Sequence, residues 1–492
     1  MGSQSPSTSP AGMKLPTIKL DTTLAQLYKR ASEKNTKSRI GLVLCGASSG
    51  LDLSPGFPRN KKYLYQDTPF NTEPPHKLTS RNKPLQRSLA MKYLSLIPQR
   101  DAFLAGPTPV VFFHTNPSKK THDQRETETT VSVLDPAQKP ELVFCDGPGA
   151  IPLAKHAIDK LAYKLALDDL HQYPLTHDLD THWFLNSKAA LAESGLPTPK
   201  SQVIRTDAPI PGLSQPPEKW IETQTARVVD AVSARQVPFV FKTQQTFGGA
   251  GTWVVASETA KEDLLRDLVD VEGPLHKLLA QVTELNAHLD PGAVVLSEMV
   301  RDPVGDFGIT FLATDASSEP VILGVSEQMI SDENAWVGST ISYSSQEKLQ
   351  ARFRPIVDQT AEFLRRHGYT GPVGIDVLED KEGGEFIVDL NVRTSGSLAL
   401  PLLKTHFMER GLACASSFGL TTKQTREEFI QRWKEEFEGG KMVVLSWYDE
   451  REGKEEKEGT SIADVVIGAE DRKELEKLME RVRKEGGDEV TF

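Results

Sequence analysis

The sequence predicts a multidomain protein of mixed α/β and α+β class. Its 492 residues are too many for one compact core and suggest about three domains. Short apolar runs that end in glycine-rich turns, "RIGLVLCGASSG" and "ELVFCDGPGA", favour an α/β domain, and apolar strands alternate with helices further along. The boundaries that we expect are a disordered tail at 1–16, an α/β domain at 17–185, two further units at 186–297 and 298–415, and a small C-terminal α/β segment at 416–492.

Composition excludes several classes of protein. The 38% hydrophobic and 25% charged residues are ordinary for a globular protein, and no apolar run is long enough to span a membrane. A formal net charge of −11 argues against a general nucleic-acid binder. Cys45, Cys145 and Cys414 show no CxxC spacing, so neither a disulfide framework nor a zinc site is indicated. We expect a cytoplasmic protein with no nucleic-acid partner and no membrane partner.

The first domain carries no decisive motif. Its turn "GASSG" lacks the GxGxxG spacing of a dinucleotide site, so a tight strand-to-helix turn is preferred. The stretch "AKHAIDKLAYKLALDDL", residues 154–170, has an apolar pattern typical of a helix. Residues 53–88 are dense in Pro, Asn and Lys and predict an irregular excursion. Near the C-terminus we expect a strand at "KMVVLSWY" and a last charged helix at "EDRKELEKLMERVRK".

A glycine-rich hairpin is predicted at "VPFVFKTQQTFGGAGTWVV", residues 237–255. Its loop holds Gly248, Gly249 and Gly251, and Lys242 closes the first strand. Glycines let backbone N–H groups approach an anion, and a lysine adds a point charge, so the pattern predicts a cover for phosphate groups. No GK[ST] follows, which excludes a Walker A loop. A flexible hairpin with a snorkelling lysine is the alternative, and it would be preferred if this stretch stood alone.

Two neighbouring stretches support the first interpretation. "NSKAALAESGLPTP" places Lys188 on a short helix, and "AVVLSEMV" sets Glu298 at the end of an apolar strand.

A second hairpin is predicted at "GPVGIDVLEDKEGGEFIVDLNVR", where a charged connection separates two apolar runs. On its second strand, Asp389, Asn391 and Arg393 share one face. A loop at 381–384 pairs Asp380 with Glu385, and this register sets Asp376 opposite Asp389.

Two carboxylates that face each other across a hairpin repel, so their pairing at this position requires an explanation. Cross-strand partners lie about 5 Å apart at Cβ, where two carboxylates repel by roughly 3 kcal/mol at an effective dielectric of about 20. A divalent cation reverses that sign, and magnesium prefers carboxylate and amide oxygens. Asp376, Asp389 and Asn391 therefore predict a magnesium site. An edge hairpin with a solvated polar face is the alternative, and flanking runs that look buried weaken it.

These motifs together resemble the ATP-grasp superfamily, in the expected order: Lys188 before "GLPTP", Lys242 before a glycine-rich hairpin, Glu298 after an apolar strand, and "GIDV…DLNVR". The resemblance covers about residues 186–405 and implies a two-subdomain ATP-grasp fold. The preceding domain is similar to the Rossmann-like domain that precedes this fold in the superfamily. Within the superfamily the chain is similar to carboxylate–amine ligases, including peptide ligases of natural-product assembly.

The resemblance implies ATP and Mg²⁺, or Mn²⁺ in its place, as cofactors, and it implies a role for each motif residue. Lys188 and Lys242 contact ATP phosphates, and Lys242 and Arg393 are the implied catalytic residues, with Arg393 near the reacting carboxylate. The other implied contacts are the closing loop at Gly248, Gly249 and Gly251, the adenine contact at Glu298 with backbone at Met299, Val300 and Arg301, the ribose contact at Asp306, and the metal ligands Asp376, Asp389 and Asn391. Many members have Glu at both acidic metal positions. The shorter Asp arms demand a closer strand or a bridging water.

The implied activity is activation of a carboxylic acid as an acylphosphate and its coupling to an amine. The partners are then small-molecule acids and amines, amino acid or peptide-like, and a homodimer is left open. Residues 326–344, with Trp336 and Gly338, form a substrate wall or, equally, an ordinary surface loop with a packing tryptophan. Two alternatives remain: another ATP-grasp chemistry, carboxylation or phosphoryl transfer, and a nucleotide-binding pseudoenzyme. No biotin-accepting lysine motif is found, which makes the carboxylation version less favoured. The presence of both lysines and the DxN set disfavours the pseudoenzyme.

Overall fold

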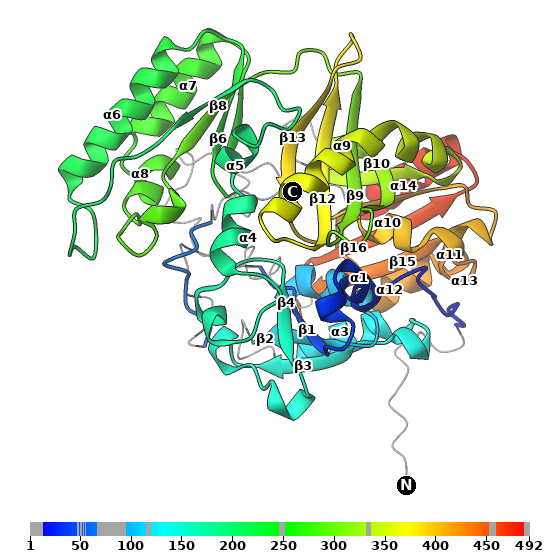
Figure 1. The fold of residues 1–492 in the computed structure, drawn as a ribbon. Helices are drawn as coiled ribbons and strands as arrows, with labels where there is room; N and C mark the ends of the chain where they lie inside the picture. Colours follow the sequence, from blue (N-terminus) through cyan, green and yellow to red (C-terminus); the bar gives the residue numbers. More distant parts are fainter. Residues whose placement is uncertain are drawn as a thin grey trace.

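The computed structural model describes residues 13–46, 49, 52, 54, 56–65, 95–114, 120–245, 251–330, 336–451 and 459–486. The strands of this part of the chain form a parallel sheet of four strands, an antiparallel sheet of four and an antiparallel sheet of eight, in three regions of the molecule (Figure 1). This arrangement confirms the predicted mixed, multidomain fold class. Over the described residues, no helix is long and apolar enough to cross a membrane.

The first sheet is parallel and has the order β3-β2-β1-β4. Its strands are β1 (Ile40–Val43), β2 (Pro109–Phe113), β3 (Glu141–Cys145) and β4 (Lys160–Tyr163). β1 and β2 are buried along their whole length, as expected for strands that are covered on both faces. Helices α1 (Leu24–Ala31) and α3 (Lys120–Ser132) belong to the same region (Figure 1).

The helix predicted over residues 154–170 is wrong. This stretch holds β4 between two short 3₁₀ turns, Ala154–His156 and Asp168–Gln172. Leu161 lies beside Gly41 in a parallel pairing with β1, and its side chain is fully buried. Pairing with a buried strand outweighs a local helical pattern when the apolar run is only four or five residues long.

The second sheet is antiparallel and has the order β5-β8-β6-β7. The strands are β5 (Ser201–Ile204), β6 (Phe239–Thr243), β7 (Thr252–Val255) and β8 (Val294–Glu298). Helices α6 (Glu218–Ala234), α7 (Glu258–Val269) and α8 (Pro274–Leu279) lie together beside this sheet (Figure 1). Phe239 and Phe241 point into the core under these helices. Because neighbours on a strand face opposite ways, Lys242 lies on the face of the sheet away from these helices.

The third sheet has the order β13-β12-β9-β10-β11-β14-β16-β15. Its strands are β9 (Gly305–Ala313), β10 (Val321–Ile330), β11 (Trp336–Ser342), β12 (Gly371–Glu379), β13 (Glu385–Asn391), β14 (Cys414–Thr422), β15 (Met442–Asp449) and β16 (Ser461–Ala469). Its helices are α9 (Gln346–Arg366), α10 (Ala399–Leu402), α11 (Lys404–Met408), α12 (Arg426–Arg432), α13 (Lys434–Glu438) and α14 (Arg472–Gly486). The boundary expected between residues 415 and 416 falls inside β14, so the C-terminal strands continue the sheet that carries the predicted metal site.

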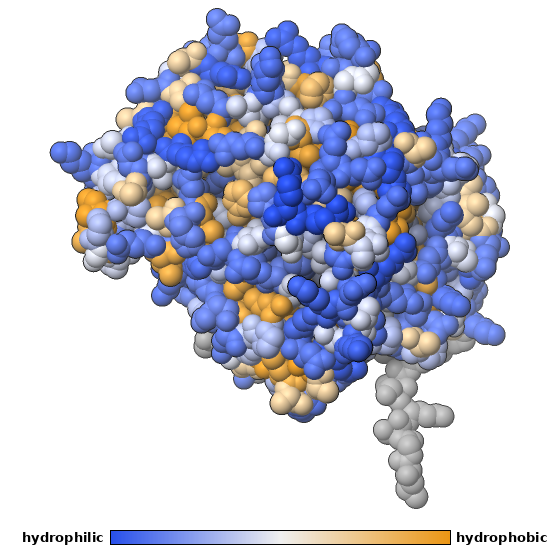
Figure 2. Space-filling view, viewed as in Figure 1, coloured by the Kyte–Doolittle hydropathy of each residue, from blue (hydrophilic) through white to orange (hydrophobic). Residues whose placement is uncertain are grey.

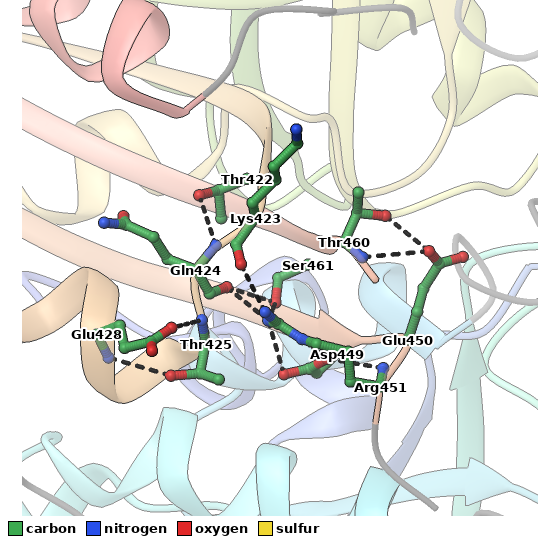
Figure 3. A network of polar contacts seen from close by, with 10 residues as sticks. All are labelled: Thr422, Lys423, Gln424, Thr425, Glu428, Asp449, Glu450, Arg451, Thr460 and Ser461. Atoms are coloured by element: carbon green, nitrogen blue, oxygen red, sulfur yellow. Dashed lines mark hydrogen bonds and ion pairs between the residues drawn. The ribbon is translucent and has the colours of Figure 1, made fainter. Parts of the chain in front are cut away.

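The side chain of Arg451 links the C-terminal strands to the turn that follows β14 (Figure 3). The Arg451 guanidinium donates hydrogen bonds to Asp449, to Ser461 and to the carbonyl oxygens of Lys423 and Gln424, at 2.5–3.0 Å. These contacts join the ends of β15 and β16 to the turn that follows β14.

The surface in the view of Figure 2 is mostly hydrophilic, with hydrophobic residues in scattered groups.

The β12–β13 hairpin departs from the predicted register at its turn and regains it at the site. Glu379, rather than Asp380, lies opposite Glu385, and residues 380–384 form the turn. A β-bulge then leaves Val388 as an extra residue on β13, since Val377 pairs with Ile387 and Asp376 with Asp389. The predicted pairing of Asp376 with Asp389 is therefore confirmed, and the bulge is what produces it.

Candidate active site

Both predicted lysines converge on the bulged part of β13. Lys188 is the first residue of α5 (Lys188–Ala192), after an N-cap at Ser187, and its Nζ lies 2.5 Å from Asp389 Oδ1. Lys242 Nζ donates to the carbonyl oxygen of Val388 at 2.7 Å. The side chain of Lys188 is only 7% exposed. Two cations from two different elements thus meet neighbouring residues of one strand.

The charges at this point shift one another's pKa. Burial, and then the nearby Lys188, lower the pKa of Lys242 to about 8. Burial alone would raise the pKa of Asp389, but Lys188, Lys242 and Arg393 hold it below its ordinary value. Burial, followed by Asp389 and Asp306, raises the pKa of Asp376 to about 7. Of the two carboxylates, Asp376 is therefore the one whose negative charge is less well compensated by nearby cations.

The donor set fits a divalent cation. Asp376 accepts hydrogen bonds from the amides of Gln328, at 2.7 Å, and Asn391, at 3.3 Å. Within the described ranges it has no ion pair with a Lys or Arg, and no group of three Asp, Glu, His or Cys residues there could hold a metal by itself. A cation at Asp376 and Asp389 would relieve their repulsion. Waters and ligand phosphates would complete its shell, as magnesium usually requires.

The side-chain amide of Asn391 turns its nitrogen toward Asp376. Its Nδ2 donates to Asp376 Oδ2, and its Oδ1 accepts from Arg393 Nη2 at 2.6 Å. This direction of the amide follows from the hydrogen-bond network. Ligation of a cation by Oδ1, as the sequence predicts, would require the amide to rotate and to release Arg393.

Arg393 lies beyond the end of the strand rather than on it, which corrects the prediction. β13 ends at Asn391, and the N–H of Arg393 turns back to the Asn391 carbonyl at 2.8 Å. The guanidinium still reaches the site, because it donates to Asn391 Oδ1 and to Asn186 Oδ1, the latter at 2.5 Å. Asn186 also accepts from the N–H of Val392 at 3.0 Å. Sequence reasoning missed Asn186, which lies two residues before Lys188.

The first domain holds the same loop from its other side. Thr394 Oγ1 donates to Asp101 Oδ2 at 2.7 Å, and Lys164 Nζ lies 2.5 Å from that oxygen. Asp101 is 1% exposed. Neither Asp101 nor Lys164 could be found from the sequence, because each lies more than two hundred residues before the loop that it helps to hold.

The residues assigned to the nucleotide base and ribose lie on the strand ends next to the link between the two antiparallel sheets. Glu298 is exposed at the end of β8. The connection to β9 begins with the other three residues, Met299, Val300 and Arg301. Asp306, the second residue of β9, lies opposite Leu378, and burial raises its pKa to about 6. It is close enough to Asp376 to raise the pKa of that carboxyl.

The predicted phosphate cover is only partly visible. Gly248 and Gly249 lie outside the described residues. Gly251 has a φ of 68°, a conformation that favours glycine. Its carbonyl accepts the N–H of Thr243 at 2.9 Å, which closes the hairpin next to Lys242.

Trp336 lies beside the site rather than on a surface loop. Its Nε1 donates to Gln328 Oε1 at 2.7 Å, and its ring packs so close to Gly396 that a Cβ there would lie 2.7 Å from it. Gly338, the other residue singled out in this segment, lies on β11 opposite Phe418. Gln328 was missed, although the segment that we singled out contains it.

Comparisons with known proteins give similarities of fold. No protein-family model matches the chain, and no curated protein matches it significantly. An N5-carboxyaminoimidazole synthetase from Staphylococcus aureus, complexed with ADP, is 10% identical, with 96% of this chain and 99% of that chain covered and a TM-score of 0.47. A biotin carboxylase domain dimer of 2-oxoglutarate carboxylase from Hydrogenobacter thermophilus, in complex with MgADP, ADP and bicarbonate, is 11% identical, with 77% and 84% covered and a TM-score of 0.47.

Proposed function

We propose that this chain is an ATP-grasp enzyme, an ATP-dependent ligase that couples a carboxylic acid to an amine. The observation that carries the proposal is the convergence of Lys188 and Lys242 on the bulge of β13, beside the facing carboxylates of Asp376 and Asp389. Two lysine side chains and two carboxylates that could hold a metal ion lie together there, and this combination of charges is suited to binding the phosphates of a nucleotide. Arg393 lies next to them.

The first step transfers the terminal phosphoryl group of ATP to a carboxylate oxygen of the acid, which gives an acylphosphate and ADP. A carboxylate is a poor electrophile because its leaving group would be oxide, whereas phosphate is a good leaving group. Phosphoryl transfer mainly needs alignment and neutralised charge. Lys188 and Lys242 bind phosphate oxygens. Asp376 and Asp389 would hold a divalent cation, which would supply further positive charge to the phosphate oxygens.

In the second step the amine attacks the acyl carbon, the C–O bond to phosphate breaks, and the amine loses a proton. Arg393 orients the carboxyl group and stabilises the oxyanion that forms. Its guanidinium donates hydrogen bonds to the amide oxygens of Asn186 and Asn391, which place it beside the metal-binding carboxylates.

The test is an acid-by-acid assay with hydroxylamine in place of the amine. The protein is mixed with ATP, MgCl₂, hydroxylamine and one of the twenty standard amino acids, and ADP and hydroxamate are both measured. For at least one acid, we expect hydroxamate and ADP to form in equal amounts. The Lys242→Ala variant should form neither product. Release of ADP with bicarbonate and no hydroxamate would indicate carboxylation instead. Binding of ADP without turnover under any condition would indicate a pseudoenzyme.

A further inference from the structure

We propose that Gln328 is a positioning residue that sets the direction of the Asp376 carboxylate toward a divalent cation, and that Trp336 and Ser339 in turn set the direction of the Gln328 amide. The inference rests on the proposed function, since it concerns the same site. None of these three residues belongs to the motifs that led to the site.

The direction of the Gln328 amide follows from its three partners. Its Nε2 donates to Asp376 Oδ1 at 2.7 Å. Its Oε1 accepts from Trp336 Nε1 at 2.7 Å and from Ser339 Oγ at 2.7 Å. A reversed amide would set an oxygen against a carboxylate and an NH₂ group against the indole N–H, which can only donate. The two donors on β11 therefore keep the N–H of Gln328 on Asp376.

Close packing leaves this arrangement little room to move. At Gly308 on β9, a Cβ would lie 2.6 Å from Gln328 Nε2, and at Gly396 a Cβ would lie 2.7 Å from the Trp336 ring. Both glycines lie against the pair, one under the amide and one under the indole. A side chain at either position would displace the group above it.

The consequence concerns which oxygen of Asp376 can meet a cation. Among the residues that the structure describes, Oδ1 accepts from Gln328 at 2.7 Å, whereas Oδ2 accepts only the longer 3.3 Å contact from Asn391. An aspartate arm is short, so once the strand is fixed, rotation of the carboxylate decides where its oxygens point. The geometry leaves Oδ2, which faces Asn391 on β13, for the cation.

The experiment measures binding of Mn²⁺, as a spin probe, to the full-length protein in the presence of ADP, by electron paramagnetic resonance. Gln328→Leu should weaken Mn²⁺ binding about tenfold, the effect of losing roughly 1.4 kcal/mol. The double variant Trp336→Phe/Ser339→Ala keeps an aromatic ring over Gly396 but removes both donors, so it should weaken binding by a similar factor. Glu327→Gln is the matched control. Glu327 directly precedes Gln328 on β10 and forms an exposed ion pair with Arg472, and the loss of this ion pair should leave Mn²⁺ binding unchanged.

The outcomes separate this inference from the proposed function. If the wild-type protein binds no Mn²⁺ with ADP, the metal site itself fails. If wild type binds and Gln328→Leu binds within twofold of it, only the role of Gln328 is overturned. A weakened Gln328→Leu beside an unchanged double variant would overturn the orienting role of Trp336 and Ser339. If Gln328→Leu does not fold, the double variant alone decides.

Discussion

Replacement of Asp389 by asparagine is the most informative single change, because Asp389 takes part in two opposing interactions. It faces Asp376 across the hairpin and pairs with Lys188 Nζ at 2.5 Å. The two side chains of that pair are 29% and 7% exposed. Asp389→Asn keeps the shape of the side chain and removes one charge from both interactions.

The stability effect is expected to be small. Leaving Lys188 without its partner should cost about 3–5 kcal/mol, the usual effect of removing one member of a buried pair. Above pH 7, where Asp376 is ionised, relief of the repulsion with Asp376 should return roughly 3 kcal/mol at about 5 Å and an effective dielectric of about 20. The net loss in the free energy of unfolding is then about 0–2 kcal/mol. Lys188→Met has no such relief and should cost about 3–5 kcal/mol.

The functional effect should be large, since one of two carboxylates for the cation is lost. We expect turnover to fall by about 10²-fold or more, the scale of losing one strong electrostatic contact to the transition state. The assay pairs urea unfolding with ADP formation over a MgCl₂ titration, for Asp389→Asn, Lys188→Met and the double variant. The double variant should unfold close to wild type and remain inactive. Normal turnover with normal magnesium dependence in Asp389→Asn would refute the metal assignment.

Three other changes test separate parts of the site. Lys242→Ala should weaken binding of a non-hydrolysable ATP analogue about 10- to 100-fold, since a hydrogen bond to a charged group contributes about 1.5–3 kcal/mol, and Lys188→Ala should do so more modestly; wild-type affinity by isothermal titration in both variants would leave the glycine hairpin as a plain loop. Arg393→Ala should lower hydroxamate formation about 10²-fold with little change in nucleotide affinity, and Arg393→Lys should rescue poorly; equal losses in turnover and nucleotide binding would move Arg393 into the ATP site. Burial, and then His177 and Arg393, lower the pKa of His182 to about 3, so the unfolded state, with a pKa of about 6.5, binds more protons below that pH and stability is lost as the pH falls through it. Between pH 7.5 and pH 5.5, His182→Phe should therefore lose about 1 kcal/mol less of its free energy of unfolding than wild type, and an identical loss in urea titrations would show that His182 is not buried in its neutral form.

Local patterns predicted those parts of the site that depend on short stretches of chain. Lys188 on a short helix and Glu298 at a strand end are found where apolar periodicity placed them. The helix predicted at residues 154–170 failed because a buried partner strand, β1, was invisible to a local pattern. The Asp376–Asp389 pairing was right although the turn was not, because nothing in the sequence marks the bulge at Val388.

The remaining parts of the site depend on contacts between distant segments. Asn186, Asp101 and Gln328 each bond to residues between 48 and 293 positions away. Polar residues of these types are common on any surface, and only the folded arrangement shows that they hold the loop of Arg393 and the carboxylate of Asp376. No spacing rule could have selected them.

The most direct test of an acylphosphate mechanism follows one oxygen atom. The acid that gives the strongest hydroxamate signal is labelled with ¹⁸O in its carboxyl group and incubated with ATP, MgCl₂ and hydroxylamine, and the released phosphate is analysed by mass spectrometry. Activation through an acylphosphate predicts that one ¹⁸O atom of each acid consumed appears in phosphate, in a one-to-one ratio to ADP. Formation of ADP together with unlabelled phosphate would contradict the account, because the acid would then not have received the phosphoryl group.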